Sequence, residues 1–200
     1  MGAHSDDIEI GCGGTILKLL ESTNVNLTWV VFCAHGEREV EAQISAKIIA
    51  KNAESLALHF KKFRDGYLPY SGHELKDFFE ELKTNISTPD IIFTHYRKDL
   101  HQDHRLISDL TWNTFRNHFI LEYEIAKYDA DLGSPNLFTH LPEIIYEKKV
   151  QIIYDNFTSQ RKKEWFTKDT FLSLMRIRGI ESNSPSKYAE AFYSRKIVLN

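Results

Sequence analysis

The chain begins with MGAHSDDIEIGCGG (residues 1–14), in which His4, Asp6 and Asp7 stand just before a glycine-rich run. Three of the four residues at positions 4–7 are ionisable, and such side chains interact more favourably with water, a proton or a metal ion than with a hydrophobic core. The glycines bring no side chain to a core either, and they predict a tight turn into a helix at residues 13–22. The stretch therefore indicates a site of chemistry after a first strand of little more than residues 1–3.

Apolar, β-branched runs alternate with helical patterns along the rest of the chain. Residues 26–34 and 91–95 are nearly all apolar, as in strands that are buried on both faces of a sheet. We expect further strands at 56–63, 119–125 and, as an edge strand, 191–199, and helices at 37–54, 73–85, 103–116, 143–160 and 168–180. This alternation predicts a doubly wound α/β fold with a mostly parallel sheet and an abbreviated first strand.

The sequence also predicts which residues of one helix face the core and where a long loop lies. For the helix expected at 37–54, the candidate core contacts are the apolar residues Val40, Ile44, Ile48 and Leu56. Residues 127–141, which contain Gly133 and Pro135, are expected to form an irregular loop.

Length and charge narrow the function classes. The 200 residues, 42% hydrophobic and 26% charged, predict a single globular domain over 1–200. A formal charge of -3 does not indicate the basic surface that nucleic-acid binding requires. The basic residues 161–163 are expected to lie on a solvated helix face. No apolar run approaches the ~18 to 20 residues that span a bilayer. Cys12 and Cys33 form no CxxC pair, which suits a reducing cytoplasm.

A second polar cluster, HQDH (residues 101–104), follows the strand expected at 91–95. In a doubly wound sheet the chain commonly reverses direction between its first and fourth strands. The loops after these strands then face each other across a crevice at the carboxyl edge. Helix capping or a surface histidine explains either cluster alone, whereas two clusters in facing loops indicate a shared site.

The side chains of the two clusters divide into ligands and proton carriers. His4, Asp7 and His104 match the two-histidine, one-carboxylate set of a catalytic zinc, whose fourth position is open to water. Asp6 and His101 remain free for proton transfer. The mixed N and O donors favour Zn2+ but also suit Fe2+ or Co2+.

Three segments resemble the signatures of one enzyme family. AHSDDIEIGCGGT (residues 3–15) resembles the AHPDDxE-G-GGT signature of the PIG-L/LmbE-like deacetylases, with Ser5 in place of the usual proline. DLHQDH (residues 99–104) resembles the DxHxDH signature, and REVEA (residues 38–42) resembles the RxxEA segment. The two longer segments are specific, because they carry five polar side chains in the family's order and spacing.

This resemblance implies a Rossmann-like, three-layer α/β/α, zinc-dependent hydrolase that removes an acyl group, usually acetyl, from the nitrogen of an amino sugar or its conjugate. At the matching positions it implies the same three metal ligands and Asp6 as the general base. It also implies that His101 stabilises the tetrahedral intermediate, that Asp103 orients His101 through a hydrogen bond, and that Arg38 binds substrate.

Two alternatives to this function stay open: an amidase that acts on a non-sugar or thiol conjugate, and a metal-binding module without catalysis. A dinucleotide site is disfavoured, because the third glycine of GxGxxG would fall at Ile16. We expect a small N-acetyl sugar or glycoconjugate as the partner and leave a homo-oligomer open. Specificity is expected to come from residues 65–73 and 127–141.

Overall fold

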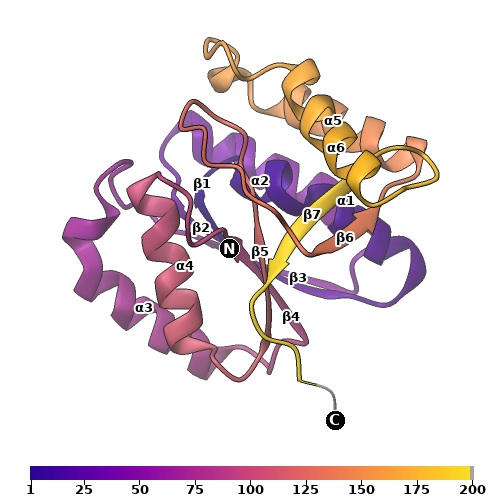
Figure 1. Cartoon of the computed structure of the whole chain (residues 1–200). Helices are drawn as coiled ribbons and strands as arrows, with labels where there is room; N and C mark the ends of the chain where they lie inside the picture. The colour runs from indigo at the N-terminus through magenta and orange to yellow at the C-terminus, as the bar shows by residue number, and fades with distance from the viewer. Residues whose placement is uncertain (199–200) are drawn as a thin grey trace.

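The computed structural model describes residues 1–198 and contains seven strands and six α-helices in that range (Figure 1). The strands are β1 (Gly2–His4), β2 (Asn26–Cys33), β3 (Ser55–Phe60), β4 (Ile91–His95), β5 (Phe119–Tyr123), β6 (Leu137–His140) and β7 (Ala189–Ser194). The α-helices are α1 (Asp7–Ser22), α2 (Glu37–Ile49), α3 (Gly72–Asn85), α4 (Gln102–Thr114), α5 (Glu143–Asn156) and α6 (Lys168–Glu181). Short 3-10 helices lie at η1 (Ala50–Asn52), η2 (Leu68–Ser71) and η3 (Thr158–Gln160).

The strands form two sheets that adjoin at β1 and β4. One sheet is parallel throughout, in the order β1-β2-β3; the other has the order β4-β5-β7-β6 and begins with a parallel pair. The ammonium group of Met1 donates to the Phe93 carbonyl at 2.8 Å, and the Ala3 amide donates to His95 Nε2 at 2.9 Å. The carboxyl ends of β1 and β4 therefore lie side by side. The predicted α/β fold, with its abbreviated first strand, is confirmed.

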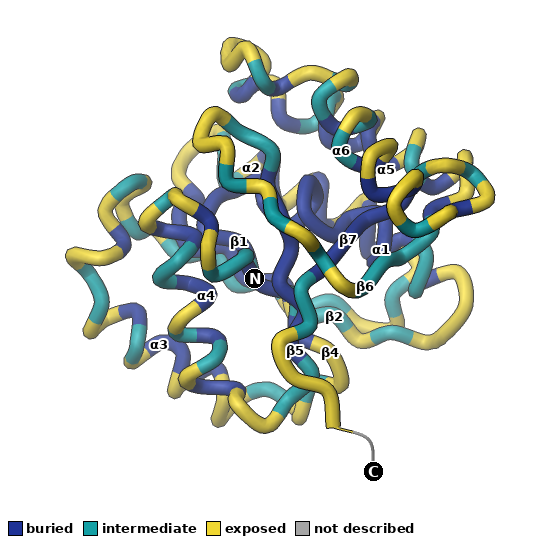
Figure 2. The backbone as a smooth tube through the Cα atoms, viewed as in Figure 1, coloured by how far each residue is buried: buried dark blue, intermediate teal, exposed yellow. Residues whose placement is uncertain are grey.

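Helices cover both faces of these sheets and give the three-layer α/β/α arrangement. The helices α1, α2, α5 and α6 lie together on one side, while α3 and α4 cover the other (Figure 1). The buried residues gather between the helices and the strands, and the exposed ones lie on loops and outer helix faces (Figure 2). The buried apolar residues form two cores, one under each helical layer. Within residues 1–198, no helix is both long and apolar enough to cross a membrane.

The predicted glycine turn is wrong, because α1 begins at Asp7 and its glycines lie inside the helix. A Cβ built on Gly11 would lie 2.1 Å from the ring of Tyr123 in β5. A Cβ on Gly14 would lie 2.7 Å from Leu141 and 3.0 Å from the Glu190 carboxylate of β7. The glycines therefore allow α1 to approach the sheet closely.

The C-terminal half of the sheet also differs from the prediction. Residues 137–140, expected in an irregular loop, form β6, which pairs antiparallel with β7. β7 pairs antiparallel with β5 as well, so it is an inner strand and the expected edge position is wrong. Of the strand expected at 191–199, residue Leu199 lies outside the described residues.

The helix α2 buries a different face from the expected one. Val40, Ile44 and Ile48 are 55%, 47% and 39% exposed, so they are not core residues. The buried face instead carries small residues, among them Ala42 and Ala46. Small side chains let α2 pack closely on its neighbours, and this contact places the longer apolar residues outward.

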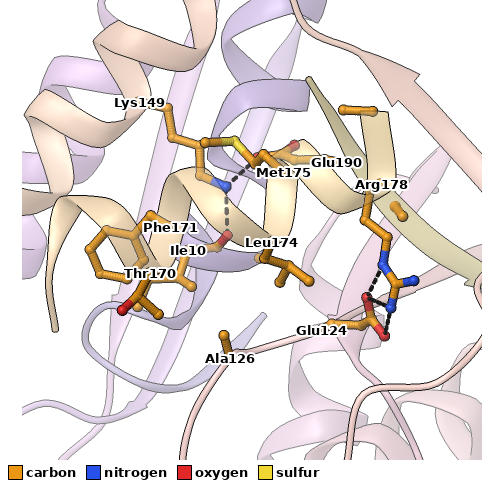
Figure 3. Close-up of a pocket in the computed structure, with 13 residues that line it drawn as sticks. Ile10, Glu124, Ala126, Lys149, Thr170, Phe171, Leu174, Met175, Arg178 and Glu190 are labelled. Carbon is orange, nitrogen blue, oxygen red and sulfur yellow. Dashed lines mark hydrogen bonds and ion pairs between the residues drawn. The ribbon is translucent and has the colours of Figure 1, made fainter. Parts of the chain in front are cut away.

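Two buried ion pairs connect α1, the strands and the C-terminal helices. Lys149 Nζ of α5 donates to the Ile10 carbonyl of α1 at 2.6 Å and to the Glu190 carboxylate at 2.7 Å (Figure 3). Arg178 of α6 makes two bonds, 2.9 and 3.0 Å long, to the carboxylate of Glu124, which follows β5. These pairs line a small cavity of about 20 Å³, and they attach the outer helices to the sheet.

Candidate metal centre

The two polar clusters, a hundred residues apart in the chain, meet at the carboxyl ends of β1 and β4. His4 is the last residue of β1, and Asp7 is the first residue of α1. His101 is the N-cap residue of α4, and His104 lies in its first turn. His4 Nδ1 is 3.1 Å from His104 Nε2. The predicted meeting of the two loops is therefore observed.

Three ligand atoms form a triangle of the size that a tetrahedral zinc requires. His4 Nδ1 is 3.1 Å from His104 Nε2 and 3.3 Å from Asp7 Oδ2, and the third side is 3.6 Å. Metal bonds of about 2.0–2.2 Å place tetrahedral ligand atoms roughly 3.3–3.6 Å apart. All three side chains are buried, and the Asp7 carboxylate is fixed by the amide of His4, which donates to it at 2.6 Å. The donor set therefore fits a divalent metal ion.

Carboxylates outside this triangle determine which nitrogen of each histidine carries the proton. His104 Nδ1 lies 2.8 Å from Asp99 Oδ2. His4 Nε2 lies 3.0 Å from Asp65 and 3.3 Å from Asp103. Because an ionised carboxylate only accepts hydrogen bonds, each outer nitrogen is the N–H donor. The inner nitrogens are then the ones that face a metal, an arrangement typical of histidine ligands.

Burial and charge set the protonation states of the triangle. Burial raises the pKa of Asp7, but His104, His95 and His4 bring it well below its ordinary value. Burial lowers the pKa of His104 to about 3. Burial also lowers the pKa of His4, but Asp7 and the outer carboxylates outweigh this effect and raise the pKa well above its ordinary value. Asp7 is thus ionised and His104 neutral, as ligands must be, while a metal would displace a proton from His4.

Asp6 lies beside the triangle with a carboxylate that is free to react. It is 4% exposed and lines the cleft, and no group within residues 1–198 donates a hydrogen bond to its side chain. Burial, followed by the charge of Asp7, raises its pKa, against the opposing effects of Arg38 and Lys163. The carboxylate is therefore suited to accept a proton.

His101 lines the same cleft as a neutral ring. Its Nδ1 accepts a hydrogen bond from the Asp103 backbone amide at 3.3 Å, so the ring proton lies on Nε2. Burial, and then the charge of His4, lowers the pKa of His101. Among the described residues, no hydrogen bond joins the Asp103 carboxylate to His101, although one is expected from the sequence; the carboxylate contacts His4 and accepts from the amides of Gly66 and Leu68.

Arg38 projects from the first turn of α2 into the cleft. Its Nη1 donates to Asp65 Oδ2 at 2.7 Å, and Asp65 in turn contacts His4. The sequence places Asp65 at the start of a loop expected to set specificity, but its contact with His4 could not be predicted, because only the folded loop after β3 brings the two together. Asp99 was part of a recognised segment, but its bond to His104 depends on how α4 begins.

His95, the last residue of β4, is fully buried behind the triangle. Its ring stacks on that of His104 at a centroid distance of 3.9 Å and an angle of 15°. Its Nε2 accepts from the Ala3 amide and lies 3.2 Å from Asp7 Oδ2. His95 therefore supports the ligands from within the sheet.

The cleft over the triangle has a volume of about 350 Å³. Its outer wall carries charged and aromatic residues from loops after β5 and η3: Lys127, Tyr128, Asp129, Lys163 and Trp165. The space is sufficient for a small molecule, since ligand sites commonly occupy about 300–1,000 Å³.

The chain resembles known proteins in sequence and in fold. The family model described as PIG-L, GlcNAc-PI de-N-acetylase, matches residues 1–115. N,N'-diacetylchitobiose deacetylase from Pyrococcus horikoshii superposes with a TM-score of 0.69 at 21% identity, covering 96% of this chain and 80% of that one. A conserved protein from Thermus thermophilus gives 0.73 at 20% identity, covering 100% and 94%.

A zinc-inhibited form of a teicoplanin deacetylase gives a TM-score of 0.70 at 14% identity and covers 96% of this chain and 95% of that one. At these identities the structures demonstrate a shared fold. The family model extends over more than half of the 200 residues, from β1 to the end of α4. This chain therefore belongs to the PIG-L family.

Proposed function

We propose that this protein is a metal-dependent hydrolase that removes the acetyl group from the nitrogen of an N-acetylated amino sugar or its conjugate. The observation that carries the proposal is the unpaired, buried Asp6 carboxylate beside three ligand atoms with the spacing of a tetrahedral metal site. A ligand set with a spare base beside it suits hydrolysis better than metal storage.

His4, Asp7 and His104 would hold the ion, for which we propose Zn2+. When bound, such an ion polarises a carbonyl oxygen and lowers the pKa of water towards ~7. The chain's own contribution is to keep Asp7 ionised and to hold both imidazoles by their outer nitrogens, so that the inner nitrogens face the ion. Asp103 acts through His4 in this arrangement, as a positioning residue.

Asp6 acts as the general base. Its carboxylate takes the proton of the attacking water, which its raised pKa favours. The amine that leaves needs a proton, and Asp6 returns the one that it has taken. Because no hydrogen bond from the described part of the chain restrains this carboxylate, it can serve both steps without breaking such a contact.

His101 donates a hydrogen bond to the oxygen of the substrate's acyl group. The Asp103 amide occupies Nδ1, so the neutral ring keeps an N–H at Nε2. A protonated His101 is not required for this role. A fixed donor at the developing oxyanion typically contributes 10²–10³-fold to the rate.

The names of the family and of two similar structures support an N-acetyl substrate, because each names a deacetylase. Arg38 and Asp65 at the cleft provide a donor and an acceptor for sugar hydroxyls. We also propose one domain over 1–200, which the 96–100% coverage of this chain by the similar structures supports. The two free, buried cysteines support a cytoplasmic location.

A substrate screen paired with metal quantification tests this function. Protein expressed with excess divalent metal should contain one ion per chain and release acetate from N-acetylglucosamine derivatives faster than from N-acetyl amino acids or thiol conjugates. Preference for the non-sugar amides would favour the amidase alternative. A stoichiometric metal without hydrolysis of any acetyl amide would favour a binding module.

A further inference from the structure

We propose that Lys163 and Trp165 form a subsite that binds an anionic group attached to the amino sugar. This inference rests on the proposed function and refines its substrate class. The shared ligand chemistry is a sugar ring bearing a phosphate or a carboxylate.

Residues 161–163 are exposed, as expected, but they do not lie on a helix. The segment that carries this subsite is a turn between η3 and α6. Lys163 lines the cleft on the same wall as Trp165, although the two belong to a part of the chain far from both polar clusters. The basic residue is therefore placed over the site by the fold.

The turn is held in place at both of its ends. At its start, the buried Glu41 of α2 accepts hydrogen bonds from the Ser159 amide at 2.8 Å, the Ser159 hydroxyl at 2.6 Å and the Thr158 hydroxyl at 3.0 Å. At its end, the ring of Phe166 is buried against Phe171 at a centroid distance of 5.1 Å. These anchors give the turn a defined position beside the cleft.

Backbone bonds within the turn add to this order. The Lys163 amide donates to the Gln160 carbonyl, and the Phe166 amide donates to the Lys163 carbonyl. A preorganised loop loses less conformational entropy when it binds a ligand. The backbone that carries both recognition residues is therefore ordered before substrate arrives.

Among the described residues that line the cleft, Lys163 is the cation that forms no ion pair, although its charge does act on Asp6 at longer range. Arg38 is paired with Asp65 at 2.7 Å, and Lys127 is paired with Asp131 at 2.6 Å. Within residues 1–198, no carboxylate lies within 4.0 Å of Lys163 Nζ. An anion on the substrate can therefore pair with Lys163 without displacing an ion pair within the protein.

Trp165 supplies an apolar face next to this charge. The side chain is half-buried and lines the cleft, and Lys163 Nζ lies 5.5 Å from the centroid of its ring. An aromatic face can cover the C–H face of a sugar ring, while the neighbouring ammonium group binds a phosphate or carboxylate substituent. Cation and ring thus match the two parts of one substrate.

The test compares neutral and anionic substrates in matched variants. The probes are the methyl glycoside of N-acetylglucosamine, N-acetylglucosamine 1-phosphate and a carboxymethyl glycoside of the same sugar. In Lys163→Gln we expect kcat/KM for the preferred anionic probe to fall about tenfold relative to the neutral probe. The exposed neighbour provides the control, since Lys162→Gln should leave the ratio unchanged. A ratio that is the same in Lys163→Gln and wild type would overturn the inference.

Comparison of the phosphate and carboxylate probes identifies the anion. Trp165→Leu should raise KM for all three probes, whereas Trp165→Phe should recover part of the loss. A loss for the anionic probes alone in Trp165→Leu would exclude the stacking role.

Binding measurements separate this inference from the proposed function. Titration calorimetry with the same sugars on Asp6→Asn protein should show tighter binding of the anionic probe and loss of that preference when Lys163→Gln is added. If the wild type hydrolyses no probe, the proposed function fails, while the binding preference still decides the subsite. Equal binding of neutral and anionic probes would overturn it.

Discussion

Replacing Gly11 with alanine tests the close contact between α1 and the sheet. The new Cβ would lie 2.1 Å from a ring carbon of Tyr123, whereas ordinary contacts begin at 3.4 Å, so α1 has to shift by more than 1 Å. The ring cannot move aside easily, because Tyr123 is fully buried and its hydroxyl donates to the Met1 carbonyl at 2.6 Å. Overpacking of this kind costs about 1–3 kcal/mol, which exceeds the gain of about 1 kcal/mol in helix propensity.

Gly13→Ala is the matched control on the same helix. Its Cβ would meet nothing closer than Ile49 at 3.6 Å, an ordinary contact. Thermal unfolding followed by circular dichroism should show a lower Tm for Gly11→Ala and a Tm raised by about 2–4 °C for Gly13→Ala. Equal stabilities for the two variants would refute the packing argument, and a less stable Gly13→Ala would refute the assigned helix.

Two further substitutions test other contacts. Asp99→Asn removes the charge that orients His104, so we expect metal affinity, measured by competition with a coloured chelator, to fall about 10-fold or more. Glu190→Gln leaves the buried Lys149 ammonium without its counter-charge, and we expect the free energy of unfolding in urea to fall by about 3–5 kcal/mol.

Each of these predictions has a control in a neighbouring carboxylate. Asp131→Asn removes a partner of Lys127 but no contact with the ligands, so it should leave metal affinity near that of the wild type. Glu147→Gln changes an exposed residue of α5 and should leave the unfolding free energy nearly unchanged. Wild-type metal affinity in Asp99→Asn, or wild-type stability in Glu190→Gln, would contradict the corresponding argument.

The pairing of the two polar clusters could be predicted because strong local patterns fix it. The apolar runs of β2 and β4 are unambiguous, and a parallel sheet brings the ends of its strands to one edge. The positions of His4 and His104 follow from that topology. The partners of these histidines could not be predicted, since Asp65 reaches His4 only through the shape of a loop.

The sequence-based predictions are wrong where contacts between distant residues override local patterns. The glycines of α1 resemble a turn until Tyr123, over a hundred residues later, is packed against Gly11. The apolar stripe of α2 points outward because the opposite face, with its small residues and Glu41, packs on neighbouring elements, where Glu41 accepts a hydrogen bond from the Ser159 amide of η3. β6 and β7 pair across about fifty residues, and β6 is a strand of four residues, too short for a clear alternating pattern.

The most direct test of the central claim is acetate release by Asp6→Asn, measured on the preferred N-acetyl sugar at equal bound metal. We predict that the variant retains one metal ion per chain and loses about 10²–10⁴-fold in rate, because its metal ligands are intact and the base is gone. Asp129→Asn, which changes an exposed carboxylate at the same cleft, should stay close to the wild-type rate. An Asp6→Asn protein that binds metal and releases acetate as fast as the wild type would contradict the proposed mechanism.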